Sequence, residues 1–322
     1  ELTTVKEKKL EWNDIGNFKN YNSTLKKYEN FNFRKTNEFI YIDKNKIIKF
    51  INSQIKIKKL ILRTKKIKVF PKIIKFKKQF IQYNYIPGRV FFNLINKNNF
   101  NNLLCFLNRK LWRITKKKNI KIICRKFYHE KTQDRIELYL KKYNFDKDFQ
   151  VKINDTLIPS IDILMNYIPW HKIYDGIPSK IHGDLQFDNI IFNKKKFYLI
   201  DWREDFSGNL DYGDLYYDLA KMYGGIEMNY DIIKKGRFSY LEKKKYIIYK
   251  YDSRKPLMKE IKQQFKKFIL LKNLSLEKIE ILKSLIYINM SPLHEYPFDK
   301  LLFAHGKFQL FKILKKYDYI PK

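Results

Sequence analysis

The most constraining feature of this sequence is an acid, an amide five residues later, and a second acid beyond a short hairpin. Asp184 and Asn189 lie in the run IHGDLQFDN at 181–189, and Asp201 follows the apolar run at 197–200. Two short β-favouring runs around the polar residues 193–196 predict a hairpin. Because Asn189 precedes its first strand and Asp201 follows its second, both side chains should reach the same end of the hairpin.

These three residue types are the ones that phosphoryl transfer from a magnesium nucleotide requires. A carboxylate accepts the proton of the attacking hydroxyl, and oxygen ligands hold the hard metal ion. The spacing matches the kinase catalytic loop, in which an Asp base is followed by a metal-binding Asn. The alternative is structural: Asp and Asn are both common in turns, and Asp201 would then be only the end of a strand.

Gly183 follows His182 where protein kinases have Arg, and in this the loop resembles the aminoglycoside phosphotransferase and choline kinase family. The resemblance implies an α+β, two-lobed protein-kinase-like fold, with a small antiparallel β-sheet N-lobe and a mainly helical C-lobe. It also implies ATP and Mg²⁺, with Asp184 as the base and Asn189 and Asp201 on the metal. The run 210–221 is similar to the helix that follows the metal-binding loop in this family. By that likeness, His182 and Asp218 have structural roles around the catalytic loop.

The chain divides into three expected parts. Residues 1–31 would be an N-terminal extension or linker, 32–88 a small β-rich N-lobe with the hinge, and 89–322 the helical C-lobe. The β-favouring runs at 39–42 and 46–51 flank a turn, and the second resembles the strand that carries a phosphate-binding lysine. Lys49 alternates with apolar neighbours, so it is the preferred candidate. Lys46 is the second candidate, and a solvated lysine is the alternative for both.

Two departures from the family pattern concern the N-lobe. Between Glu38 and Glu130 there is no Glu, so the following helix at 53–67 lacks the acid that usually pairs with the lysine. Gln54 is a candidate replacement. The run 31–37 stands where a glycine-rich phosphate loop is expected but has no glycine, which leaves backbone amides, Arg34 or Thr36 for that role.

The run 80–88 ends in Pro-Gly and resembles the family's hinge between the lobes. That likeness makes the Asn84 carbonyl and the Ile86 amide the contacts for adenine. A plain two-residue turn is the alternative.

The acceptor is expected on the C-lobe side of Asp184. Trp202 and Arg203 lie beside Asp201, the expected metal ligand. The loop at 291–297 could bring His294 and Glu295 to an amine or sugar hydroxyl of the acceptor. A capped connection between helices is the alternative for this loop. Family members that bind choline use aromatic rings, a role open here to Trp170, Trp202 and Tyr296. The expected acceptor is an amino alcohol such as choline, another small alcohol or a sugar, with a role in surface polysaccharide synthesis.

Composition bounds the other function classes. The net charge of +35 suggests an anionic partner, but the lysines are spread along the chain, and the abundance of Lys, Asn, Ile, Phe and Tyr is typical of AT-rich coding sequence. A nucleic-acid-binding protein is therefore the less favoured alternative, together with a nucleotide-binding pseudokinase or scaffold. The sequence has no membrane-spanning run and no signal pattern, which predicts a cytoplasmic enzyme. The run 11–17 and Tyr21 resemble the end of a sugar nucleotidyltransferase, which suggests fusion to such a domain upstream.

Overall fold

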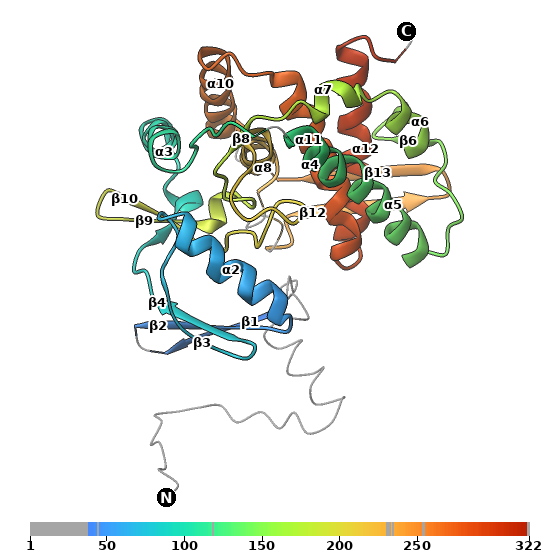
Figure 1. The fold of residues 1–322 in the computed structure, drawn as a ribbon. Helices are drawn as coiled ribbons and strands as arrows, with labels where there is room; N and C mark the ends of the chain where they lie inside the picture. Colours follow the sequence, from blue (N-terminus) through green and yellow to red (C-terminus); the bar gives the residue numbers. More distant parts are fainter. Residues whose placement is uncertain are drawn as a thin grey trace, which may run out of the picture.

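A computed structural model describes residues 38–43, 45–117, 119–229, 233, 235–252 and 255–320. The expected N-terminal extension at 1–31 and the expected phosphate loop at 31–37, with Arg34 and Thr36, lie outside the described residues. Within the described part, the two-lobed kinase-like fold is confirmed: a small antiparallel sheet with one helix stands apart from a larger, mainly helical lobe (Figure 1).

The N-lobe sheet is antiparallel throughout, with strand order β1-β2-β4-β3. Its strands are β1 (Glu38–Asp43), β2 (Lys46–Ile51), β3 (Ile73–Lys77) and β4 (Phe80–Asn84). One face of β2 is buried and carries Ile47, Lys49 and Ile51, as the alternation predicts. Helix α2 (Gln54–Lys66) covers the sheet on the side of the C-lobe (Figure 1) and begins at Ser53, whose hydroxyl accepts the Lys56 N–H at 3.2 Å.

The chain leaves the N-lobe after β4 and pairs at once with the metal-site hairpin. Strand β5 (Arg89–Val90) lies antiparallel to β9 (Ile190–Asn193), which in turn pairs with β10 (Lys196–Leu199). A Cβ at Gly88 would lie 2.8 Å from the backbone oxygen of Phe192, and its φ is +154°. Glycine is therefore required at this position because the backbone passes directly over the hairpin.

The helices of the C-lobe surround the catalytic segment. They are α3 (Lys97–Lys110), α4 (Ile120–Cys124), α5 (Lys131–Lys142), α6 (Ile161–Asn166), α7 (Trp170–Tyr174), α8 (Leu215–Glu227), α10 (Lys255–Leu271), α11 (Leu276–Met290) and α12 (Phe298–Lys316). A π-helical turn at Arg125–Glu130 joins α4 to α5. Among these described helices, none is long and apolar enough to cross a membrane.

The C-lobe also contains a four-stranded sheet that sequence reasoning did not predict, with order β12-β13-β6-β7. Its strands are β6 (Val151–Ile153), β7 (Thr156–Ile158), β12 (Phe238–Lys243) and β13 (Tyr246–Tyr251). Strands β6 and β13 pair in parallel although about ninety residues separate them, which no local pattern reveals.

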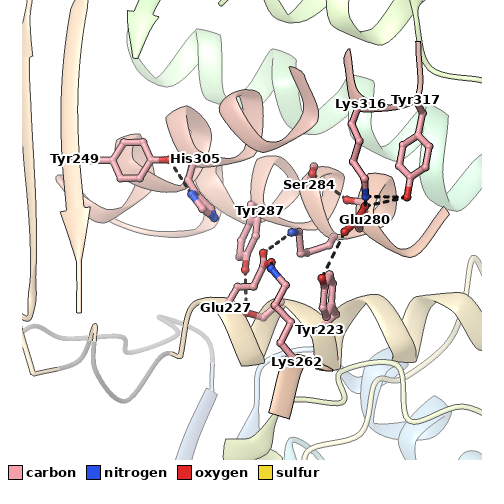
Figure 2. A network of polar contacts seen from close by, with 12 residues as sticks. Tyr223, Glu227, Tyr249, Lys262, Glu280, Ser284, Tyr287, His305, Lys316 and Tyr317 are labelled. Carbon is pink, nitrogen blue, oxygen red and sulfur yellow. Dashed lines mark hydrogen bonds and ion pairs between the residues drawn. The ribbon is translucent and has the colours of Figure 1, made fainter. Parts of the chain in front are cut away.

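A network of polar contacts joins α8, α11 and α12 inside the C-lobe (Figure 2). Glu227 pairs with Lys262 at 2.5 Å and also with Lys283, and these cations lower its pKa to about 2 although burial alone would raise it. Tyr249 and His305 are hydrogen-bonded at 2.9 Å, and burial lowers the pKa of His305 to about 3. The catalytic segment therefore rests on a helical platform with fixed internal charges.

Candidate active site

Asp218 binds the backbone of the loop that contains Asp184. It lies on α8 and is fully buried, and it accepts the backbone N–H groups of His182 and Gly183, both at 2.8 Å. The indole Nε1 of Trp112 donates to the same carboxylate at 3.1 Å. Burial raises the pKa of Asp218 to about 6, even though these hydrogen bonds oppose the rise. Through these contacts Asp218 fixes the backbone of the loop at His182 and Gly183.

His182 joins the catalytic loop to the end of the hairpin. Its ring Nε2 lies 2.8 Å from the Ile200 carbonyl, so it carries the proton, and Nδ1 accepts the Asp184 N–H at 3.2 Å. The ring is fully buried, and burial lowers the pKa of His182 to about 4. His182 is therefore neutral near pH 7 and fixes the backbone of Asp184 instead of taking part in proton transfer.

The hairpin brings Asn189 and Asp201 together, as its pattern predicts. Leu199 pairs with Ile190, and the next step is a hydrogen bond of 2.9 Å from the Ile200 N–H to the Asn189 carbonyl. The Asn189 side-chain nitrogen donates to the Asp184 carbonyl oxygen at 2.9 Å and to Asp184 Oδ2 at 3.3 Å. Its amide oxygen consequently points away from Asp184, which suits a metal ligand.

These residues fit a magnesium ion that also takes oxygen from phosphate and water. Within the described residues no group of three or more His, Cys, Asp or Glu side chains could hold a metal alone. Mg²⁺ commonly uses one or two carboxylates and completes its shell with substrate phosphates and water. The Asp201 carboxylate is 31% exposed, so it is open to such a ligand.

Lys49 reaches the site from the N-lobe sheet. Its Nζ lies 3.0 Å from Asp201 Oδ1 and 3.1 Å from Glu38 Oε2. Burial alone would lower the pKa of Lys49, but the two carboxylates outweigh it and raise that pKa, so the ammonium stays charged. Lys46, the second candidate, is exposed at the start of β2.

Glu38 takes the position of the missing helix glutamate, and this corrects the expectation for Gln54. In the register of β1 and β2, Ile40 lies opposite Lys49, and Glu38 stands two residues before Ile40 on the same face. Diagonal neighbours of this kind are within reach of long side chains. Gln54 is instead an exposed residue at the start of α2.

Arg63 is a buried contact between the lobes that sequence reasoning missed. It lies on α2, is 2% exposed, and donates to the Ile181 carbonyl at 2.6 Å and the Arg203 carbonyl at 2.5 Å. Burial lowers the pKa of Arg63 to about 10, which leaves the guanidinium charged. In a helix rich in lysine and arginine, no local signal distinguishes this residue from its solvated neighbours.

The hinge candidates lie at the end of β4. Asn84 is exposed at the last position of the strand, and the Tyr85 N–H donates to the Asn45 carbonyl at 2.8 Å. Ile86 follows before the close approach at Gly88. Both residues thus stand between the lobes, where the adenine role remains a prediction.

The aromatic residues expected to line an acceptor site have separate surroundings. Trp202 is 6% exposed and stacks on Phe70 at 5.0 Å, while Trp170 stacks on His129 at 4.1 Å. Tyr296 is 64% exposed. The three rings therefore do not form one cage for a cationic acceptor.

His294 and Glu295 lie in the connection between α11 and α12. The His294 ring packs against Phe298 at 5.1 Å, and Glu295 is an exposed partner of Lys142 at 3.6 Å. The connection follows Met290, whose sulfur lies 3.6 Å from Lys221 Nζ. Lys221 in turn lies next to Asp184. The loop at 291–297 therefore stays a candidate for contacts with the acceptor.

Lys221 is a neighbour of Asp184 that the sequence did not single out. It lies one turn after Asp218 on α8, is 7% exposed, and its Nζ stands 2.7 Å from Asp184 Oδ1. Burial alone would lower the pKa of Lys221, but Asp184 outweighs it and raises that pKa. Asp184 therefore lies between a protonated lysine and Asn189.

Comparison with known proteins agrees with this geometry. Residues 125–251, which include the catalytic loop and the metal-site hairpin, match the phosphotransferase enzyme family. No curated protein matches the sequence significantly.

Several solved structures are similar to this one. A thermostable mutant of aminoglycoside phosphotransferase APH(4)-Ia is 10% identical with a TM-score of 0.50, over 87% of this chain and 90% of that one. An ethanolamine kinase from Plasmodium vivax is 14% identical (TM-score 0.47; 91% and 85% of the two chains), and a choline kinase from Cryptosporidium parvum is 13% identical (TM-score 0.42; 90% and 93%).

The matched segment contains Asp184, Asn189 and Asp201, and Lys49 reaches Asp201 from the N-lobe sheet. The chain is therefore similar to small-molecule kinases, and its residues 125–251 match the phosphotransferase enzyme family.

Proposed function

We propose that the chain transfers the γ-phosphate of ATP to a hydroxyl group of a small molecule, with Asp184 as the base. The observation that carries this proposal is the ion pair between Lys49 Nζ and Asp201 Oδ1 at 3.0 Å, which joins the N-lobe to the metal-site hairpin. A lysine and a metal-binding acid in contact across two lobes is the arrangement that positions a magnesium nucleotide.

Each residue has a role in this mechanism. Asp184 accepts the proton of the acceptor hydroxyl as the hydroxyl attacks phosphorus, and Asn189 and His182 hold its carboxylate and backbone in place. Lys49 binds the α- and β-phosphates, and the backbone at Asn84 and Ile86 binds adenine. Asn189 and Asp201 would hold Mg²⁺, which neutralises phosphate charge when bound. Catalysis is then mainly positioning and charge stabilisation.

The acceptor class is an alcohol, amino alcohol or sugar, and the reaction would take place in the cytoplasm, where magnesium nucleotides are supplied. A phosphorylated product could be activated further for a surface polysaccharide, which is the reason to test sugars and simple alcohols side by side.

The test measures ADP release from ATP and Mg²⁺ with a panel of acceptors: choline, ethanolamine, glycerol, simple sugars and aminoglycosides. The acidic compounds glycerate and glycerol 3-phosphate are included in the panel. We expect turnover with at least one acceptor and its loss in Asp184→Asn. The matched control is Asp211→Asn, which changes an exposed acid in the segment just before α8. Failure of ATP to bind at all would contradict the proposal.

A further inference from the structure

Basic side chains gather beside the catalytic acid on the side away from the N-lobe sheet. We call Lys131, Arg135, Arg203 and Lys221 the basic cluster. Lys221 touches Asp184, and a Cβ at the adjacent Gly183 would lie only 2.6 Å from Arg203 Cβ, so the Arg203 stem passes directly over the catalytic loop.

The aromatic rings beside the basic cluster already have protein cations over them. The Arg203 guanidinium lies 5.0 Å from the centre of the Phe127 ring, and Lys131 Nζ lies 3.9 Å from the same ring. Lys131 Nζ is also 6.0 Å from the Tyr217 ring. A quaternary ammonium acceptor would have to compete with these cations for the same aromatic faces.

The carboxylates near the basic cluster are largely engaged elsewhere. Asp205 accepts from Lys59 of α2 at 2.6 Å, and Glu204 lies 3.8 Å from Lys56 of α2. Asp134 raises the pKa of Arg135, but burial and the charge of Arg203 outweigh it. Despite burial, Glu204, Asp184 and Asp205 nevertheless raise the pKa of Arg203, so the cations whose pKa is lowered are Lys131 and Arg135.

The cluster carries an electrostatic cost as it stands. Burial lowers the pKa of Lys131 well below its usual value, and the charges of Arg203, Arg135 and Lys221 lower it further. The Nε of Arg203 is buried and has no hydrogen-bond partner among the described residues. Despite burial, nearby carboxylates raise the pKa of Arg203 and Lys221, so the electrostatic cost falls on Lys131 and Arg135, and a bound anion would relieve it.

We propose that the acceptor already carries an acidic group, a carboxylate or a phosphate, next to the hydroxyl that is phosphorylated, and that the basic cluster binds this group. This inference rests on the proposed function and narrows its acceptor class. Arg203 supplies a planar fork suited to either anion, while Lys131 and Lys221 contribute point charges. The acidic group then fixes the acceptor so that its hydroxyl faces Asp184.

The experiment uses matched three-carbon alcohols that differ in charge: glycerol, glycerate, glycerol 3-phosphate and the amine 2-amino-1,3-propanediol. Binding of a non-hydrolysable ATP analogue with Mg²⁺ is measured first, which tests the nucleotide site independently of the acceptor. Each alcohol is then titrated onto the nucleotide-saturated protein by calorimetry, and turnover is followed as ADP release. Inorganic phosphate serves as a fifth probe that needs no hydroxyl.

We expect glycerate, glycerol 3-phosphate or phosphate to bind roughly tenfold or more tightly than the neutral and cationic compounds. Arg203→Gln and Lys131→Gln should remove that preference and leave nucleotide affinity unchanged. The control is Lys126→Gln, an exposed lysine of the same helical segment, which should change neither. Carboxylate and phosphate probes tell the two anions apart.

Three results would overturn the inference: tighter binding of the neutral or cationic alcohol, an anion preference that persists in both cluster variants, or no anion binding at a nucleotide-saturated site. If the nucleotide itself fails to bind, the proposed function fails instead. Each failure is therefore separately visible.

Discussion

The cations on the two sides of the catalytic loop differ in how they are partnered. Towards the N-lobe, Lys49 lies between Glu38 and Asp201, and Lys56 pairs with Glu38 at 2.5 Å. Towards the C-lobe, the basic cluster gathers beside Asp184, and Lys221 pairs with that carboxylate at 2.7 Å. On the N-lobe side carboxylates raise the pKa of Lys49, whereas on the C-lobe side burial and neighbouring cations lower the pKa of Lys131 and Arg135.

This difference suggests that the two groups of cations have different roles: Lys49 positions the nucleotide, and the basic cluster recognises the acceptor. Lys49 has partners that hold it in place before any ligand arrives, which is what a phosphate-binding lysine requires. In the basic cluster, burial and neighbouring cations lower the pKa of Lys131 and Arg135, so the charged forms of these two residues become more favourable when an anion binds. Three changes sharpen or break the contrast, and they are considered from the largest expected effect to the smallest.

Asp184→Asn should have the largest effect. Loss of a general base typically lowers the rate by about 100- to 10,000-fold, so turnover should fall into that range while nucleotide affinity is retained. The same change removes the carboxylate beside Lys221, so anions should bind as well as before or more tightly. Calorimetry with phosphate and initial-rate kinetics check both parts, and weaker anion binding in this variant would break the contrast.

The pH dependence of stability should differ between the site and the C-lobe core. At the site, His182 has a folded pKa of about 4 and Asp218 of about 6. As pH falls below 6.5, the unfolded chain protonates His182 first, which destabilises the fold. Between about pH 6 and pH 4 the folded state protonates Asp218 first, which stabilises the fold, so the two effects largely cancel.

In the core, His305 and Glu227 act in the same direction. The folded pKa of His305 is about 3, so the unfolded chain takes up its proton from about pH 6.5 downward, and Glu227, with a folded pKa of about 2, adds to the loss below about pH 4.5. At pH 4 the His305 contribution to the loss of unfolding free energy should be roughly 3 kcal/mol. In His305→Gln, urea unfolding between pH 7 and pH 4 should therefore show a flatter decline than in the wild type. Equal slopes would contradict this cause.

Glu38→Gln should have a smaller effect, confined to the nucleotide side. Lys49 and Lys56 both lose a carboxylate, so Lys49 is held less firmly and nucleotide affinity should fall roughly tenfold. Gln54→Ala is the control, since Gln54 is exposed and should leave the affinity unchanged. Titration of a non-hydrolysable ATP analogue measures both affinities. A larger loss in Gln54→Ala than in Glu38→Gln would mean that Gln54, on α2, is the partner of Lys49.

The sequence predicts well those parts of the site that short-range geometry determines. The spacing of Asp184 and Asn189 and the hairpin before Asp201 bring the three together, and alternation in β2 identifies Lys49. Glu38 was missed because it precedes the lysine and reaches it diagonally across two strands, whereas the usual partner follows on a helix.

Long-range contacts account for the rest. Arg63 and Lys221 are single basic residues in a chain rich in them, and only the packing of α2 and α8 against the catalytic loop gives them their roles. The C-lobe sheet depends on the parallel pairing of β6 with β13, distant in the sequence. Its strands β12 and β13 form a hairpin whose alternation passed unnoticed in a region read as helical.

The contrast between the two sides is tested most directly by kinetics on a matched pair of variants, Lys49→Met and Arg203→Met, with the Michaelis constants for ATP and for the acceptor measured in each. Lys49→Met should raise the KM for ATP roughly tenfold or more and leave that for the acceptor nearly unchanged, and Arg203→Met should do the reverse. If both variants raise the same constant, the two sides do not serve different substrates, and the division of the site proposed here is wrong.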